Sequence, residues 1–251
     1  MGSLLEKVLT EGVERLRERE LPPIEVAVLD SGIDAKHPDL EGSVAKAFKV
    51  NVGDDSSTLE EHPVGSHDSY GHGTAVGSII KGIAKNVKLV DYRVLGPDNT
   101  GAGEALLLCI KDAVDAGYRV INMSLAAKAD FAPRLIPICD KAYRNGQVIV
   151  AAKRNMPLTD MGFPAEIVSV VSVDRTKFPH PWGVRYSPAN IIEFIGHGEE
   201  VKVAAPGGGY TTKTGTSFAT PALSGVVALL LSAYPDLRPF EVKSILRAWS
   251  E

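Results

Sequence analysis

Val26-Ala27-Val28-Leu29 leads directly into Asp30-Ser31-Gly32-Ile33-Asp34 near the start of this 251-residue chain. The first four residues are solidly apolar, without the alternation of a half-exposed strand, which is typical of a parallel sheet covered on both faces. The glycine turn that follows leaves Asp30 at the carboxyl end of the strand. Functional crevices of such sheets lie beyond these strand ends. The stretch therefore predicts both the type of sheet and the edge where a functional site would lie.

The rest of the chain repeats this alternation of short apolar runs and longer helical patterns. We expect strands at residues 24–29, 46–50, 87–93, 119–123, 147–152, 167–173 and 201–204. We expect helices at residues 72–81, 103–116, 133–145, 216–233 and 239–249. The pattern predicts an α/β fold, a three-layer sandwich with a mainly parallel central sheet flanked by helices. An amphipathic helix is expected over residues 1–21, followed by a single domain over residues 22–251.

Composition excludes several classes of protein. The net charge is −4 and no block of Lys or Arg is present, so nucleic acid is not an expected partner. The longest apolar stretch, residues 226–231, is too short to span a bilayer, and the N-terminal segment lacks the pattern of a signal peptide. Cys109 and Cys139 lie in apolar or helical patterns and are interpreted as buried thiols, compatible with a reducing compartment. We therefore expect a cytoplasmic protein without membrane contact.

Three polar residues that suit acyl transfer stand at the ends of expected elements. Asp30 ends a strand, His72 lies between two glycines at a helix start, and Ser217 precedes a long apolar run. Each has a structural alternative: an Asx turn, a structural histidine and a helix N-cap. Together they supply a nucleophile, a base that takes its proton and an acid that orients the base. The set predicts nucleophilic catalysis at the crevice.

The segments that carry these residues resemble a known family. Asp-Ser-Gly-Ile-Asp at 30–34, His-Gly-Thr at 72–74 and Gly-Thr-Ser-Phe-Ala-Thr-Pro at 215–221 are similar, in this order, to the three signature segments of the subtilisin-like serine proteases, the subtilases. The resemblance extends over about residues 24–249. It implies a serine endopeptidase that acts on peptide or protein substrates and needs no cofactor.

The same resemblance implies a substrate cleft and an oxyanion hole. Gly101-Ala102-Gly103 resembles one wall and Ser124-Leu125-Ala126 the other, and an extended peptide would bind between them through its backbone. An ordinary loop before a helix is the alternative for the first segment. Asn155 occupies the position of the family's oxyanion asparagine, with a turn-forming residue as the alternative.

The chain departs from the family pattern at Lys153-Arg154, where relatives usually carry small residues that line the pocket for the side chain before the scissile bond. The two cations admit three interpretations. They favour an acidic substrate side chain, they fill the pocket, or they point to solvent. Ala126-Ala127, where Gly-Gly is common, also indicates a narrow pocket. The hypothesis is an acidic preference or a restricted pocket.

Two further expectations concern metals and backbone geometry. Residues 81–86 contain no carboxylate and leave little room for the calcium-binding insertion of many relatives, so we expect no metal there. The acidic residues Asp54, Asp55, Glu60 and Glu61 are interpreted as a solvated loop. Phe163-Pro164 resembles the family's cis-proline turn.

Two other functions stay open: a pseudoprotease that only binds peptides, and a dedicated precursor-processing protease or peptide ligase.

Overall fold

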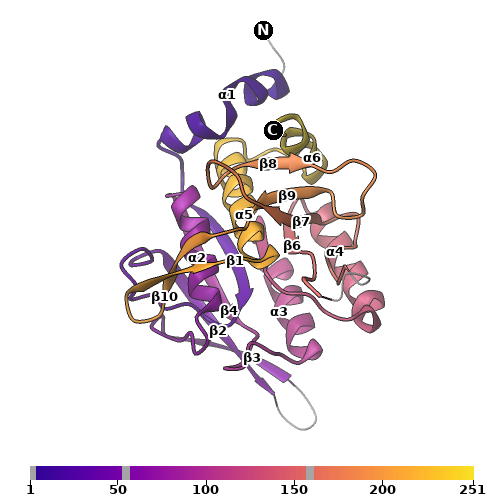
Figure 1. Cartoon of the computed structure of the whole chain (residues 1–251). Coiled ribbons are helices and arrows are strands. Elements are labelled where there is room, and N and C mark those ends of the chain that lie inside the picture. The colour runs from indigo at the N-terminus through magenta and orange to yellow at the C-terminus, as the bar shows by residue number, and fades with distance from the viewer. Residues whose placement is uncertain (1–3, 53–56, 157–160) are drawn as a thin grey trace.

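The computed structural model describes residues 4–52, 57–156 and 161–251 (Figure 1). Its strands are β1 Ile24–Asp30, β2 Val44–Val52, β3 Ser57–His62, β4 Val87–Arg93, β5 Val120–Met123, β6 Val148–Ala152, β7 Val171–Thr176, β8 Val184–Tyr186, β9 Phe194–His197, β10 Val201–Ala205 and β11 Gly209–Lys213. Its helices are α1 Leu4–Glu18, α2 His72–Ile83, α3 Gly103–Asp115, α4 Ala132–Arg144, α5 Thr216–Ala233 and α6 Pro239–Ala248, with a 3-10 turn η1 at Ala129–Phe131.

Nine strands form the central sheet, in the order β3-β2-β4-β1-β5-β6-β7-β9-β8. All neighbours are parallel except the outer pairs β2–β3 and β8–β9. One face is covered by α2 and α5 and the other by α3 and α4, each with its own apolar core. The predicted three-layer α/β sandwich with a mainly parallel sheet is confirmed.

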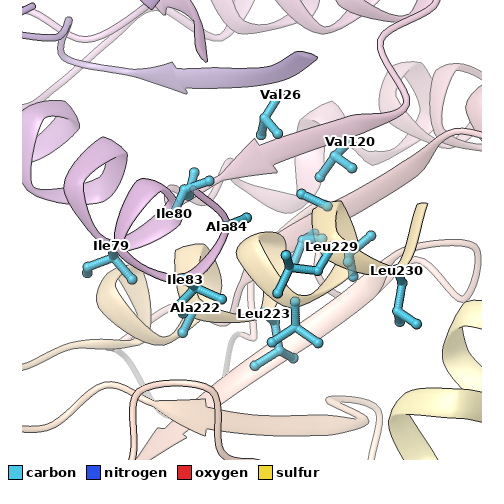
Figure 2. Packing of buried hydrophobic residues seen from close by; sticks show 14 of the residues in the cluster. Val26, Ile79, Ile80, Ile83, Ala84, Val120, Ala222, Leu223, Leu229 and Leu230 are labelled. Atoms are coloured by element: carbon cyan, nitrogen blue, oxygen red, sulfur yellow. The ribbon is translucent and has the colours of Figure 1, made fainter. Parts of the chain in front are cut away.

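Helix α5 is the central, almost completely buried helix of one layer. Its side chains Ala222, Leu223, Leu229 and Leu230 lie among those of α2 and the sheet, as Figure 2 shows. A Cβ on Gly225 would lie 2.8 Å from Cβ of Ile83, so the two helices approach more closely than a larger residue allows. The helix is long and apolar enough to cross a membrane, yet 89% of it is buried inside the molecule, as expected of a core helix.

The observed strands differ from the expected ones in the position of two strands and in the presence of four more. The strand expected at 167–173 begins only at Val171, because Ile167 donates its N–H to the carbonyl of Pro164 and Val170 to that of Ile167 in a turn. The strand expected at 201–204 lies outside the central sheet and pairs antiparallel with β11. Strands β3, β8, β9 and β11 were not predicted, because they are short or polar. The cis bond at Phe163-Pro164 is confirmed.

Helix α1 packs across the ends of three other helices. It kinks at Gly12, where φ is 67°, and buries Val13 and Leu16 in the core shared with α5. Arg17 donates hydrogen bonds of 3.2 Å and 3.1 Å to the carbonyl oxygens of Ile83 and Gly82. These are carbonyls at the C-terminal end of α2, which have no partner within the helix. The N-terminal segment is therefore tied to the helix that begins at His72.

Candidate active site

A buried carboxylate and a histidine meet at the expected edge of the sheet. Asp30 ends β1 with none of its surface exposed, and its Oδ1 lies 2.7 Å from Nδ1 of His72, the first residue of α2. Gly73 permits this approach, because a Cβ there would lie 2.2 Å from the carbonyl oxygen of Gly32. Burial of the ring opposes its protonation, but the charge and hydrogen bond of Asp30 outweigh burial and raise the pKa of His72.

The start of α2 is held by a carboxylate that sequence reasoning missed. Asp68 accepts hydrogen bonds from the backbone N–H of Gly71 at 2.7 Å and of Thr74 at 2.9 Å. Its Oδ1 also accepts the hydroxyl of Ser31 at 2.8 Å, and that hydroxyl oxygen accepts the N–H of Gly73. A carboxylate at this end satisfies unpaired N–H groups and complements the helix dipole. The sequence signal is an Asp four residues before His72.

Ser217 is the second residue of α5 and lies in the first turn of that helix. The ring of the next residue, Phe218, lies 5.4 Å from the ring of His72. The preceding Thr216 donates its N–H to Oδ1 of Asn155 at 3.3 Å and its hydroxyl to the carbonyl of Lys153 at 2.6 Å. Within the described residues no hydrogen bond joins the Ser217 hydroxyl to His72, and such bonds commonly tighten only with substrate bound.

A cleft of about 620 Å³ opens beside Ser217. The structure brings every residue expected to bind substrate to its lining, namely Gly101, Ala102, Gly103, Ser124, Leu125, Ala126, Lys153 and Arg154, together with Asn155. A Cβ on Gly103 would lie 1.9 Å from Cζ of Phe131, so close packing explains the glycine in that wall. The cleft therefore has two walls of the kind expected for an extended peptide.

Comparison with known proteins decides the family. The sequence model of the subtilase family matches residues 23–249. The chain belongs to the subtilase family. The subtilases are serine endopeptidases, and the parallel sheet, the cleft and the Asp30–His72 pair of this chain agree with that activity.

Individual relatives agree with this assignment. Subtilisin DY of Bacillus licheniformis is 32% identical over 245 residues, which cover 89% of this subtilase and 82% of the relative. The major intracellular serine protease of Bacillus subtilis is 31% identical, with 97% and 79% covered. The chain spans 60% of the length of subtilisin E. Among solved structures, Sphericase and the S41 psychrophilic protease each give a TM-score of 0.72, at 25% and 26% identity, covering 93% of this chain and 87% of theirs.

The two cations of this subtilase at 153 and 154 have different surroundings. The ammonium group of Lys153 lies 2.7 Å from Oδ2 of Asp174 on β7, and only 18% of the Lys153 side chain is exposed. Arg154 donates from Nη2 to the carbonyl oxygen of Ala127 at 2.8 Å, so its guanidinium lies in the lining of the cleft beside Ala127. The interpretation that both point to solvent is wrong, since Lys153 forms a half-buried ion pair and Arg154 is bonded to Ala127 in the lining of the cleft.

A second carboxyl group lies buried near the catalytic edge. Asp91 of β4 is paired in register with Val28, two residues before Asp30. Its Oδ2 accepts the N–H of Ile33 at 3.0 Å, whereas its buried Oδ1 has no hydrogen-bond partner among the described residues. Burial raises the pKa of Asp91 to about 8. The sequence signal is an acid that interrupts an apolar strand, and sequence reasoning missed it.

This burial predicts a pH-dependent stability. The folded-state pKa of Asp91 lies above the ordinary carboxyl value of 3.8, so the folded chain binds this proton more tightly and loses stability as pH rises toward 8. Asp91→Asn cannot ionise. We compare the free energy of unfolding of Asp91→Asn with that of the parent. The difference should shift in favour of the variant by roughly 2–4 kcal/mol between about pH 5 and pH 8.5. Thermal and urea unfolding in a Ser217→Ala background, which prevents self-digestion, measures the difference.

The matched control is Asp98→Asn, because hydrogen bonds from Thr100 lower the pKa of that exposed carboxyl group. Its stability relative to the parent should not change across the same pH range. Equal pH profiles for Asp91→Asn and its parent would show that Asp91 is ionised in the folded protein throughout.

Metal binding finds little support in the described part of the chain. No group of three or more His, Cys, Asp or Glu there could hold a metal ion. The connection from α2 to β4 is a tight turn, with hydrogen bonds from the N–H of Ala84 to Ile80 and of Val87 to Ala84. Glu60 lies 3.3 Å from Lys49, while Asp54 and Asp55 lie outside the described residues. Calcium independence stays a prediction.

Proposed function

We propose that this subtilase hydrolyses peptide bonds through a triad of Asp30, His72 and Ser217 and an acyl-enzyme intermediate. The observation that carries the proposal is the 2.7 Å hydrogen bond between Asp30 and His72, whose ring lies 5.4 Å from the ring of Phe218, the residue after Ser217. The substrate is a peptide or protein that lies extended between the walls at Gly101–Gly103 and Ser124–Ala126.

The chemistry follows from these positions. Oγ of Ser217 attacks the substrate carbonyl carbon while Nε2 of His72 takes the hydroxyl proton. Asp30, bonded to Nδ1, fixes the tautomer and stabilises the imidazolium. When the tetrahedral intermediate collapses, the C–N bond breaks and His72 gives its proton to the leaving amine. Water then attacks the acyl-enzyme by the same route and frees Ser217.

The oxyanion of the intermediate is assigned to two donors. One is the backbone N–H of Ser217, which has no partner within its helix at this first-turn position. The other is the side-chain amide of Asn155. Because the N–H of Thr216 is bonded to Oδ1 of Asn155, the Nδ2 group is the part left to donate to the oxyanion.

A fluorophosphonate probe tests the proposal directly. It should label Ser217 of the folded protein, and neither the denatured protein nor Ser217→Ala should react. Absence of labelling in folded protein would instead support a peptide-binding pseudoprotease, an alternative that the Arg154 side chain in the lining of the cleft favours. A dedicated precursor-processing protease or ligase shares the acyl-enzyme, so product analysis with added amine nucleophiles separates that function.

Arg154 is proposed to set the preference for the side chain before the scissile bond. Its guanidinium lies in the lining of the cleft, bonded to the carbonyl oxygen of Ala127, so the hypothesis of an acidic or restricted pocket is tested at Arg154. We expect Arg154→Gly to raise kcat/KM for large apolar side chains at that position about tenfold or more relative to Glu. Cleavage-site profiling by mass spectrometry measures this ratio.

Lys153→Met is the matched control, since the ammonium group that it removes contacts Asp174, a residue that does not line the cleft. It should change the ratio far less than Arg154→Gly does. A parent enzyme that already prefers large apolar residues before the scissile bond would contradict the hypothesis.

The cytoplasm is the proposed location. The relatives include intracellular serine proteases as well as proteins named subtilisin. Both cysteines are free and buried, which suits a reducing compartment. Cell fractionation with an antibody against the folded protein tests the location.

A further inference from the structure

Two buried carboxyl oxygens near the catalytic edge of the sheet have no hydrogen-bond partner among the residues that the structure describes. One is Oδ2 of Asp30, whose other oxygen, Oδ1, accepts the Nδ1–H of His72 and the backbone N–H of Ser31. The other is Oδ1 of Asp91, whose Oδ2 accepts the N–H of Ile33 at 3.0 Å. A buried oxygen without a donor costs free energy, so a donor shared by these two oxygens would satisfy both.

The register of β1 and β4 places the two carboxyl groups on one face of the sheet. Asp91 pairs with Val28, and Asp30 follows Val28 by two residues along β1. Because alternate residues of a strand share a face, Asp91 and Asp30 point to the same side on neighbouring strands. This is the side that α2 covers, since Val28 and Leu89 pack in the same core as that helix.

The turn after β1 and the first turns of α2 enclose this part of the face. A backbone N–H of the turn donates to Asp91 and so brings the turn over β4. A Cβ on Gly73 would lie 3.1 Å from Cβ of Asp30 on β1. A Cβ on Gly77 would lie 3.2 Å from Cδ1 of Leu89 on β4. Helix α2 therefore contacts both strands, and the two carboxyl groups lie in the enclosed space beneath it.

The charges around this space determine which carboxyl group carries a proton. The charged and titratable groups that surround it are Asp30 on β1, His72 at the start of α2, Asp68 before that helix and Arg93 on β4. Burial, with the nearby charges of Asp68 and Asp30, raises the pKa of Asp91 to about 8. The N–H of Ile33 and the charge of Arg93 oppose this effect but are weaker. At neutral pH Asp91 is thus a carboxylic acid, and the oxygen left to carry its proton is Oδ1.

We propose that Asp91 is a positioning residue for the triad, whose Oδ1–H group donates a hydrogen bond to Oδ2 of Asp30, directly or through one buried water molecule. The inference rests on the proposed peptidase function. One such hydrogen bond satisfies both unpaired oxygens. It also holds the Asp30 carboxylate from the side of β4, so that Oδ1 stays aimed at His72. A carboxylic acid kept neutral by burial can act as a donor in this way.

The role of Asp91 should depend on pH. When its proton leaves, both oxygens become acceptors without a donor, and two like charges repel each other in a buried space. Asp30 then loses its support from β4, so we expect kcat of the parent to fall above about pH 8. The added negative charge alone would have the opposite effect, because it favours the imidazolium of His72. The direction of the change therefore separates positioning from simple charge.

Two substitutions of Asp91 test the proposal through kcat and KM on one peptide substrate. Asp91→Leu is similar in size but has no donor or acceptor, and we expect it to lower kcat about tenfold at pH 7 with little change in KM. Asp91→Asn can accept from Ile33 and donate to Asp30, so it should recover the rate that Asp91→Leu loses. Because its amide cannot ionise, its kcat should not fall above pH 8 as that of the parent does.

Ser172→Ala is the matched control for the loss of a buried polar group. Ser172 is 1% exposed and accepts the N–H of Glu193 at 2.9 Å, but it lies on β7, which β1, β5 and β6 separate from β4. Its kcat should equal that of the parent. Circular dichroism and the unfolding midpoint show whether each variant folds. If Asp91→Leu does not fold, the parent and Asp91→Asn above pH 8 still decide the matter.

The outcomes separate the two proposals. A parent enzyme that cleaves no peptide would contradict the peptidase function, and this inference with it. In an active parent, equal kcat for folded Asp91→Leu at pH 7, or parallel profiles of the parent and Asp91→Asn up to about pH 9, would overturn the role of Asp91 alone. So would a parental kcat that rises above pH 8 where that of Asp91→Asn does not. A loss in Ser172→Ala as large as in Asp91→Leu would show a general structural effect and also count against it.

Discussion

Ser217→Ala is expected to lower kcat by about 10⁶-fold, a magnitude measured for subtilisin, a member of the same family. The variant keeps the cleft and the oxyanion donors but has no atom to form the acyl-enzyme. His72→Ala should cost about as much, because an unassisted serine hydroxyl is a poor nucleophile. The double variant should be no worse than either single one, since the two residues act as a unit.

Steady-state kinetics on one peptide substrate, with the three variants and the parent, tests this expectation. Circular dichroism and a thermal unfolding midpoint close to that of the parent show that each variant is folded. The residual rate of the variants should remain above the rate of uncatalysed peptide hydrolysis in water, because the oxyanion donors and substrate binding remain. Losses that multiply in the double variant would show that Ser217 and His72 act independently.

Asp30→Asn is expected to lower kcat by roughly 10⁴-fold, the loss known for the same substitution in a serine protease of unrelated fold. Asp30 is wholly buried and accepts hydrogen bonds from His72 and from the N–H of Ser31. An amide in its place can donate to Nδ1 of His72 and so stabilise the wrong tautomer of the ring. Oxygen and nitrogen are similar in size, so the fold should persist.

The pH profile distinguishes this role from a structural one. Asp30 raises the pKa of His72 against burial, so removing its charge lets burial lower that pKa. The base must be neutral to act, and the acid limb of kcat/KM should therefore move to lower pH in Asp30→Asn. Asp68→Asn is the comparison variant: the charge of Asp68 also raises the pKa of His72, but less than Asp30 does, so its acid limb should move less than that of Asp30→Asn. An unmoved acid limb in Asp30→Asn would contradict the assignment.

The sequence predicts the elements that local patterns determine. The uninterrupted apolar residues of β1 and the helix starting at Thr216 were placed correctly, because burial on all sides leaves a continuous apolar run. At Val168 the sequence predicts a strand where the structure has a turn. Its apolar side chain resembles that of a strand, yet 84% of it is exposed. Hydrophobicity alone does not tell a strand from a surface turn.

Partners distant in sequence account for what could not be predicted at the site. The role of Lys153 depends on Asp174, which follows it by twenty-one residues and comes beside it only through the pairing of β6 with β7. The unusual protonation of Asp91 depends on burial from several elements at once. The residues of the proposed triad, in contrast, could be proposed from the sequence because each stands in a short motif with its own glycine.

The contact between Ile83 and Gly225 couples the stability of this enzyme to the geometry of its proposed active site. Helix α2 starts at the proposed base, His72, and α5 carries the proposed nucleophile, Ser217, in its first turn. Deeper in the core the two helices are in close contact at Gly225, where a Cβ would lie 2.8 Å from Cβ of Ile83. A bulkier residue there would push the two helices apart and spread the reacting groups at their near ends. A substitution that adapts the enzyme to a higher or lower temperature therefore cannot change this contact alone. Compensating substitutions elsewhere in the two helices must accompany it.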